Sequence, residues 1–236
     1  MRTFFFFCFL FISGGLLAQS DRFHVHLRSG ASIPLFEYAS PDLDNGCFTK
    51  TGFSASVAAS GTLIGSWGLV AEAGFHTHPL DVSYLGYEKV QADPFLLDVT
   101  IRSEPYRILT FTGGPMYHIK PFKGFHLQLA VLAGYFASRT PHQVYKPVYF
   151  LTGPEFYEIT TSLDRSFGYG ASASLSYEIT PCYELALDAE LLRSKAEFQF
   201  LTGTGTIRTD TRQISMVNIA LSLMLKLPSW HTNSAQ

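Results

Sequence analysis

The sequence predicts an all-β fold: an eight-stranded antiparallel up-and-down transmembrane β-barrel. Three observations carry this prediction. Charged residues make up 15% of the chain, well under the roughly 25% of soluble globular proteins, while aromatic residues also reach 15%. Apolar and polar residues alternate along many segments. Beyond the N-terminus, no apolar run approaches the ~20 residues of a membrane helix, and a spanning chain without helices must form a closed barrel.

The N-terminus predicts a secretory signal peptide at residues 1–18. Arg2 supplies the positive charge, Phe4–Ile12 the apolar core, and small residues lead to a cleavage site after Ala18. Residues 19–236 then form one barrel domain. Because Arg2 leaves with the signal, 16 lysines and arginines face 19 acidic residues, a net charge of −3. That balance offers no electrostatic basis for binding nucleic acid.

Eight segments carry the period-two alternation of a half-buried strand. In the last one, Val217, Ile219 and Leu221 alternate with Asn218 and Ala220. Each segment has roughly ten residues, enough to cross the ~25 Å apolar band of a barrel when tilted. The expected strands are Phe23–Ile33, Phe53–Leu63, Leu69–Thr77, Tyr106–Ile119, Phe125–Tyr135, Phe167–Ile179, Tyr183–Leu191 and Val217–Leu227.

The links between these strands alternate between long and short, as extracellular loops and periplasmic turns of outer-membrane barrels do. In the second long link, Val82–Tyr87 and Phe95–Ile101 could add two strands and give a ten-stranded barrel. We prefer extensions beyond the membrane, because Tyr106–Ile119 already fills one span. The long links are Leu35–Thr51, Pro79–Pro105, Arg139–Ser162 and Phe198–Asp210, and the short ones lie near 64–68, 120–124 and 180–182.

The orientation of the two faces separates a membrane barrel from a soluble, lipocalin-like ligand-binding barrel, which would turn its apolar face inward. Small residues such as Ser172 and Ser174 build the polar face, which suits a narrow interior better than a solvated surface. The carboxylates of Tyr183–Leu191 share one face and would be costly in lipid. Aromatics at ten-residue spacing, such as Phe125 and Tyr135, predict girdles at both membrane interfaces.

The segment Thr112–Tyr117 (Thr-Gly-Gly-Pro-Met-Tyr) is similar to the Gly-Pro-x-Tyr strands of small outer-membrane β-barrels. With the strand and loop pattern, it makes the chain resemble this family of Gram-negative bacteria, OmpA/OmpX-like in its transmembrane part. The resemblance implies a place in the cell outer membrane. It implies outer-membrane lipid and lipopolysaccharide as partners, and the barrel-assembly machinery during insertion. Two departures are the lack of a peptidoglycan-binding domain and a last strand that continues past Trp230 to Gln236.

Every second residue of each expected strand faces the interior, and these inward positions include many charged side chains, which we call the lumen polar network. An eight-stranded barrel is just wide enough for side chains to fill, so we expect a closed, salt-bridged plug. This favours a structural or surface-interaction role; the alternative is a narrow, porin-like pore for small solutes or ions. The network comprises Arg28, Glu72, Glu178, Glu184, Asp188, Glu190, Lys226 and His126.

Histidines are the candidates for metal binding and catalysis. His24, His26, His118 and His126 fall at the periplasmic ends of strands on opposite sides of the ring, so we expect no metal site and no cofactor. His76 lies at the height of the outer leaflet, where barrel enzymes act. No His-x-Ser or Gly-x-Ser-x-Gly pattern accompanies it, so we expect no enzyme.

The outer rim offers a second candidate region, which could bind an unknown extracellular ligand. Exposed aromatics can anchor partners, although packing between strand extensions is the interpretation we favour. Cys47 falls in the first long link and Cys182 in the last short turn, too far apart for a disulfide. The rim candidates are His76, His78, Tyr84, Tyr87, Tyr149 and Tyr157.

Overall fold

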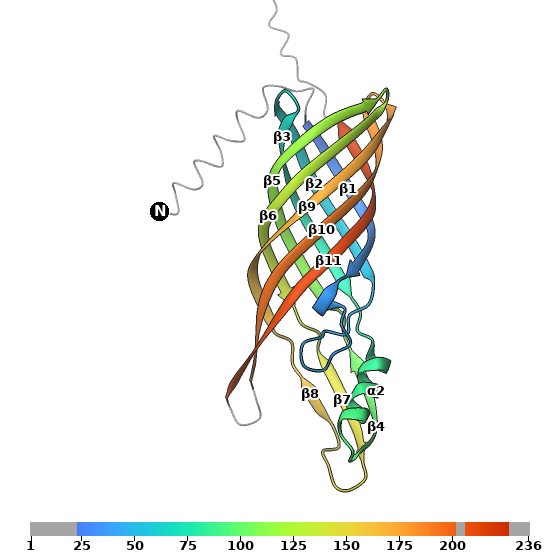
Figure 1. Ribbon diagram of the computed structural model, residues 1–236, viewed down its shortest axis with the longest axis vertical. Coiled ribbons are helices and arrows are strands. Elements are labelled where there is room, and N and C mark those ends of the chain that lie inside the picture. The colour runs from blue at the N-terminus through green and yellow to red at the C-terminus, as the bar shows by residue number, and fades with distance from the viewer. Residues whose placement is uncertain (1–22, 202–205, 227–236) are drawn as a thin grey trace, which may run out of the picture.

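The computed structural model describes residues 23–201 and 206–226 (Figure 1). The predicted signal peptide and Trp230 lie outside these residues. Eight of the described strands close into an antiparallel barrel in the ring order β1-β11-β10-β9-β6-β5-β3-β2, as the sequence predicts. The barrel strands are β1 (Phe23–Pro34), β2 (Gly52–Ile64), β3 (Trp67–His78), β5 (Tyr106–Phe122), β6 (Phe125–Arg139), β9 (Leu163–Thr180), β10 (Tyr183–Leu201) and β11 (Ile207–Lys226).

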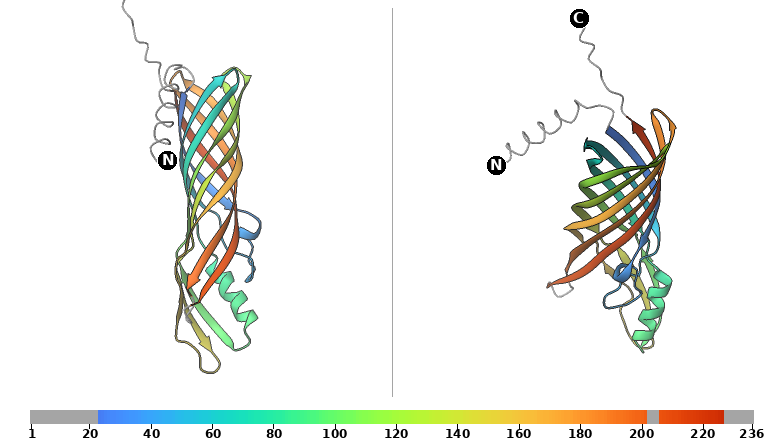
Figure 2. Two further views of the ribbon diagram at one scale, coloured as in Figure 1. Left: turned by 90° about the vertical axis from the view of Figure 1, so that its left-hand side faces the viewer. Right: turned by 45° about the horizontal axis from the view of Figure 1, so that its top comes forward.

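Two-residue turns close one end of the barrel. They are Gly65–Ser66, Lys123–Gly124 and Pro181–Cys182. Gly65 and Gly124 have φ angles of 60° and 81°, a left-handed conformation that glycine adopts without steric cost and that is common in tight hairpins. The predicted short links are therefore confirmed, and both ends of the described chain lie at this same end (Figure 2). We call it the periplasmic end.

The outward face of the barrel is apolar, as predicted. Along β10, Leu185 and Leu187 are 48% and 53% exposed, whereas their neighbours Ala186 and Asp188 are buried. This excludes the soluble interpretation, in which the leucines would fill the interior. Among the described residues, the two helical segments are too short to cross a membrane.

Aromatic side chains ring both ends of this apolar face. Near the periplasmic turns, the Trp67 and Tyr117 rings lie 5.0 Å apart and those of Phe125 and Tyr177 lie 4.9 Å apart. Toward the other end, Tyr135 is paired with Phe167 across β6 and β9, and both are about half exposed or more. The spacing of these aromatics confirms the predicted girdles.

Beyond the outer girdle the chain builds a separate lobe, which we call the head. It contains α2 (Val82–Ala92), β4 (Leu96–Ser103), β7 (Gln143–Tyr149) and β8 (Tyr157–Ile159). The three strands form their own sheet in the order β4-β7-β8 (Figure 1). The head therefore adds no strand to the barrel, and the eight-stranded alternative is the one observed.

The expectation that Val82–Tyr87 extends a strand is wrong, because this segment is the start of α2. Asp81 caps the helix by accepting a hydrogen bond from the Tyr84 backbone N–H at 3.2 Å. Val82, Leu85 and Val90 recur at helical spacing, so one side of the helix packs against β4 and its neighbours. The sequence Phe95–Ile101 does contain a strand, but it pairs with β7.

The last long link is also shorter than predicted. Much of Phe198–Asp210 is strand, because β10 and β11 stay paired out to Leu201 and Ile207. Inward-facing Ala196 and Phe198 continue the alternation of β10 beyond the membrane band. Short η2 (Phe36–Tyr38) packs against β11 at this level.

Candidate functional site

The interior of the barrel holds all eight residues of the predicted lumen network, and it divides them into two groups. Arg28, Glu72, Asp188 and Glu190 form a group that we call the central network. His126, Glu178, Glu184 and Lys226 gather at the periplasmic end and form the mouth network.

The central network joins strands across the ring. The Arg28 guanidinium on β1 donates to Glu72 Oε2 on β3 at 2.6 Å, and its Nη2 lies 3.5 Å from Asp188 Oδ1 on β10. Asn218 on β11 donates its amide N–H to Glu190 Oε2 at 2.8 Å. Since β3 and β10 lie on opposite sides of β1 in the ring, one arginine connects the two sides.

Charge in the central network is unevenly matched. Three carboxylates share one guanidinium, and both Asp188 oxygens and Glu190 Oε1 lack a hydrogen-bond partner among the described atoms. A cavity of about 10 Å³, enough for roughly one water molecule, lies beside these groups and His76.

The mouth network centres on Lys226 of β11. Its ammonium lies 2.8 Å from Glu184 Oε1 and 3.2 Å from Glu178 Oε1. His126 Nε2 lies 3.8 Å from Glu184 and 3.9 Å from Glu178, and its Nδ1 is 3.1 Å from His118 Nε2. The predicted salt bridges are thus present, and two histidines from neighbouring strands meet beside them.

The outer part of the lumen also holds an apolar cluster, which the sequence analysis missed. Ile108, Phe136, Leu192, Ile214 and Met216 are each at most 1% exposed and pack together inside the wall. A signal for this was present. Pairs such as Tyr135-Phe136 and Leu191-Leu192 break the alternation, and a strand that is apolar on both faces at one point must bury an apolar side chain inward.

The rim histidines lie inside the barrel and not at an exposed rim. His76 Nε2 lies 3.1 Å from the Thr110 hydroxyl, and His78 contacts Ser32 Oγ at 2.9 Å. The His78 Nδ1 lies 3.2 Å from the hydroxyl of Tyr38, which covers it. Both imidazoles are buried and hydrogen-bonded within the wall, so a ligand at the surface would not reach them.

The four rim tyrosines also fall into different places. Tyr84 and Tyr87 are 43% and 57% exposed on α2. Tyr157 instead stacks on Tyr145 with ring centroids 4.6 Å apart, and Tyr149 packs on the same core of the head. The six predicted rim residues therefore do not form one site.

A pocket of about 410 Å³ lies where the head meets the barrel, and we call it the outer pocket. Apolar side chains including Tyr106, Phe198 and Leu85 line it. Cys47 also lines it, and burial raises the pKa of its thiol to about 11. Both Cys47 and Cys182 are free, in agreement with their predicted separation.

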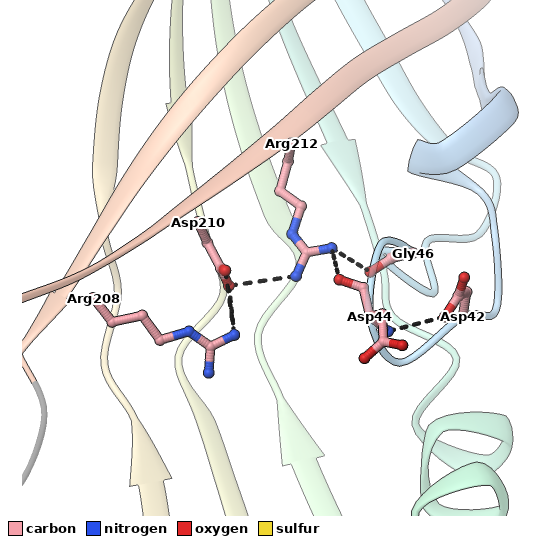
Figure 3. A network of polar contacts seen from close by, with 6 residues as sticks. All are labelled: Asp42, Asp44, Gly46, Arg208, Asp210 and Arg212. Carbon is pink, nitrogen blue, oxygen red and sulfur yellow. Dashed lines mark hydrogen bonds and ion pairs between the residues drawn. The ribbon is translucent and has the colours of Figure 1, made fainter.

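Two arginines border the outer pocket on β11 (Figure 3). Arg212 donates to the backbone carbonyls of Asp44 and Gly46 at 2.9 and 3.4 Å, and it lies 3.3 Å from Asp210 Oδ2. Arg208 approaches Asp210 at 3.2 Å, from a side chain that is 66% exposed. Arg212 thus ties the first extracellular loop to the extended hairpin, which fixes one wall of the pocket.

The tip of the head exposes apolar side chains to water. These residues lie in or beside β4, β7 and the turn after β7, and Figure 1 shows these strands at the opposite end of the molecule from the two-residue turns. All are more than half exposed, and water-exposed apolar clusters commonly mark interaction surfaces. The tip patch consists of Phe95, Leu97, Val148, Phe150, Leu151 and Phe156.

Known proteins resemble this chain in structure but not in sequence. No family model and no curated protein matches the sequence. Neisserial surface protein A is 11% identical, covers 87% of this chain and 97% of its own, and has a TM-score of 0.50. Ail of Yersinia pestis (10% identity, 88% and 100% coverage, TM-score 0.43) and a major outer membrane protein of Thermus thermophilus (13%, 86% and 98%, 0.48) are also similar.

At 11% identity, the likeness to the Neisserial protein shows the fold, that of a small outer-membrane β-barrel. Together with the exposed apolar belt and its aromatic girdles, it confirms the predicted resemblance and the predicted place in the cell outer membrane.

Proposed function

We propose that this outer-membrane β-barrel is a non-conducting anchor that holds an extracellular head for contact with molecules outside the cell. The central network carries the proposal. Arg28 reaches Glu72 on one side and Asp188 on the other, and the cavity beside them has a volume of about 10 Å³. A hydrated ion needs a continuous water path, and charged side chains that meet across the lumen at this level support a closed barrel.

The apolar outer lumen supports the same function. An ion that entered from outside would have to pass Phe136, Leu192 and Met216, all buried in one cluster. Transfer of an ion into an apolar environment is strongly unfavourable unless it is paired. Two barriers of different chemistry therefore lie in series along the lumen, one apolar and one ionic.

The head supports the surface-interaction part of the proposal. It has its own core of buried residues, including Leu96, Val99 and Tyr145, so its shape does not depend on a ligand. The exposed tip patch, with Phe150 at 71% and Leu151 at 70% exposure, lies on this rigid support. Exposed aromatic and aliphatic groups on a preformed surface are the kind of anchor that protein interfaces use.

The alternative is a narrow pore, and planar-bilayer recordings of the pure, refolded protein distinguish the two. We expect no stepwise current from the full chain. Regular current steps that scale with the amount of protein would contradict the anchor.

A trimmed variant identifies what seals the barrel. Residues 82–103 and 143–159, which hold the head, are each replaced by a short glycine-serine link. We expect this variant to keep the heat-modifiable gel migration of a folded barrel and to remain non-conducting, because the central network is intact. Current steps in the trimmed variant alone would show that the head closes the barrel and would contradict the role assigned to Arg28.

A further inference from the structure

The mouth network contains three potential metal ligands from three adjacent strands. They are His126 Nε2 on β6, Glu178 Oε2 on β9 and Glu184 Oε1 on β10. These ligand atoms all lie within 4.8 Å of one another. A salt bridge to Lys226 is the simplest explanation of the two carboxylates, because its ammonium contacts both.

The salt bridges of Lys226 do not account for the position of the His126 imidazole. His126 Nε2 is buried and has no hydrogen-bond partner among the described atoms. It points toward Glu184 and Glu178 at 3.8 and 3.9 Å, which is longer than the 2.7–3.2 Å of an N–H···O hydrogen bond. An imidazole nitrogen held near two carboxylates without bonding either leaves a gap of the size that a cation fills.

His118 orients this nitrogen. Its Nε2 lies 3.1 Å from His126 Nδ1, so the Nδ1–H of His126 can donate to His118 and leave the Nε2 lone pair free. Metal-binding histidines commonly donate their second N–H in this way. On the Glu184 side, Ser176 donates its hydroxyl to Oε2 and leaves Oε1 as the ligand atom.

We propose that the periplasmic mouth binds a zinc-like divalent transition-metal ion through His126, Glu178 and Glu184, in competition with the Lys226 ammonium. With bonds of ~2.0–2.2 Å, tetrahedral ligand atoms lie about 3.3–3.6 Å apart. The observed 3.8 and 3.9 Å separations from His126 therefore need to shrink by a few tenths of an ångström, and the Glu178–Glu184 separation, which is at most 4.8 Å, needs to reach the same length. Calcium and magnesium prefer six or more oxygen ligands, which two carboxylates and an imidazole do not supply.

Access and charge agree with such an ion. The side chains of Glu178 and Lys226 are 37% and 25% exposed, so the site opens to the periplasm. Two carboxylates and one ammonium leave a net negative charge, and replacing the ammonium by a divalent ion neutralises the group. His24, the register partner of Lys226 on β1, lies next to the same mouth.

The test is calorimetric titration of Zn²⁺ alone into the tag-free, folded barrel in detergent. We expect one equivalent per chain, an affinity at least tenfold lower in His126→Ala, and a higher affinity in Lys226→Met, which removes the competitor. His142→Ala is the matched control, because His142 forms a similar His–Glu pair with Glu158 in the head at 3.4 Å. Zinc binding by that variant should equal that of the unaltered protein.

Co²⁺ absorption provides a second readout, since four-coordinate cobalt with a nitrogen ligand absorbs strongly in the visible. That band should be absent in His126→Ala, while heat-modifiable migration shows that the variant still folds. The proposal is overturned if the unaltered protein binds no zinc, if His126→Ala binds it equally well, or if Lys226→Met weakens binding. If Lys226→Met binds zinc and the unaltered protein does not, the Lys226 ammonium is the cation that occupies the mouth, and the proposal is also overturned.

Discussion

The barrel and the head arrange apolar and polar residues in opposite ways. In the barrel wall, Leu187 faces out and Asp188 faces in, whereas in the head Leu85 and Val99 face in, and beside them Lys50 and Asp81 pair at the surface. The two regions belong to one chain and use the same residue types. The difference shows that the surrounding medium, lipid or water, decides which face an alternating segment buries. Ion pairs should therefore contribute more to stability in the barrel, and helix caps should contribute more in the head.

The largest expected effect is on the central network. Arg28→Met leaves Glu72, Asp188 and Glu190 together without their cation. Breaking one partner of a buried ion pair costs about 3–5 kcal/mol. We expect a loss of this order in the free energy of unfolding, measured by urea denaturation of the barrel in lipid vesicles.

Lys50→Met is the comparison outside the barrel, where Lys50 of the first long link pairs with the capping residue of α2. It removes an ion pair to Asp81 at 2.9 Å, of the same type but with the lysine side chain 57% exposed. Exposed pairs contribute about 0–1 kcal/mol, so this variant should unfold nearly as the unaltered protein does. Equal costs for Arg28→Met and Lys50→Met would remove the distinction between the two regions.

The next largest effect concerns packing inside the barrel. A Cβ on Gly168 of β9 would lie 2.3 Å from a ring carbon of Phe136, which fills the outer lumen. Overpacking of this kind costs about 1–3 kcal/mol, so Gly168→Ala should lower the urea midpoint. The double variant Gly168→Ala with Phe136→Leu should recover part of the loss, and no recovery would argue against this contact.

The cap of α2 sets the expected acid sensitivity of the head. Asp81, the capping residue, forms a side-chain hydrogen bond with Lys50, and this bond is the main cause that holds the pKa of Asp81 below 3.8 in the folded protein. Because the folded state then binds the proton more weakly than the unfolded state, this stabilisation is present above about pH 4 and is lost as the pH falls through the lowered pKa. Hydrogen exchange should show α2 losing protection at low pH before the barrel strands do.

Asp81→Ala should abolish this acid step and weaken α2 by about 1 kcal/mol at neutral pH, the usual contribution of an N-cap. If hydrogen exchange of α2 keeps the same pH dependence in this variant, a group other than Asp81 causes the acid sensitivity of the head.

The smallest expected effect is a gain in the stability of α2. Gly86 lies inside α2, and a Cβ there would meet its nearest atom, the Val99 carbonyl oxygen, at an ordinary 3.5 Å. Replacing a mid-helix glycine by alanine stabilises by about 0.5–1 kcal/mol. Gly86→Ala should therefore slow hydrogen exchange in α2, whereas Gly168→Ala destabilises the barrel. Faster exchange in Gly86→Ala would show that the helix is packed too tightly against β4.

Much of the barrel could be predicted because the bilayer imposes a strict period of two. Leu185 and Leu187 are exposed and Asp188 is buried as their parity predicts, and the turns at Gly65 and Gly124 carry a local signal. The head was harder, since α2 and β4 depend on contacts between distant segments such as Ile101 with Tyr145.

The sequence could predict which charged residues face the lumen, but not which of them contact one another. Parity places Arg28 and Glu184 inside, yet it says nothing of which charges meet across the ring. The ring is narrow enough for Arg28 on β1 to reach Glu72 on β3, two strands away. His118 and His126 came together because their strands are neighbours in a tight hairpin, a pairing that the search for spaced metal motifs overlooked.

The most direct measurement of a sealed lumen is thiol access at Ser222, which faces inward beside Arg28 and is 1% exposed. Ser222→Cys is made in a chain whose Cys47 and Cys182 are serine, reconstituted in vesicles and exposed to a water-soluble maleimide on each side in turn. We expect no labelling from either side until the barrel is unfolded, with Cys182 of the otherwise unaltered protein as the labelled reference. Rapid labelling of Ser222→Cys from both sides of the folded barrel would reveal a continuous water path and contradict the sealed anchor.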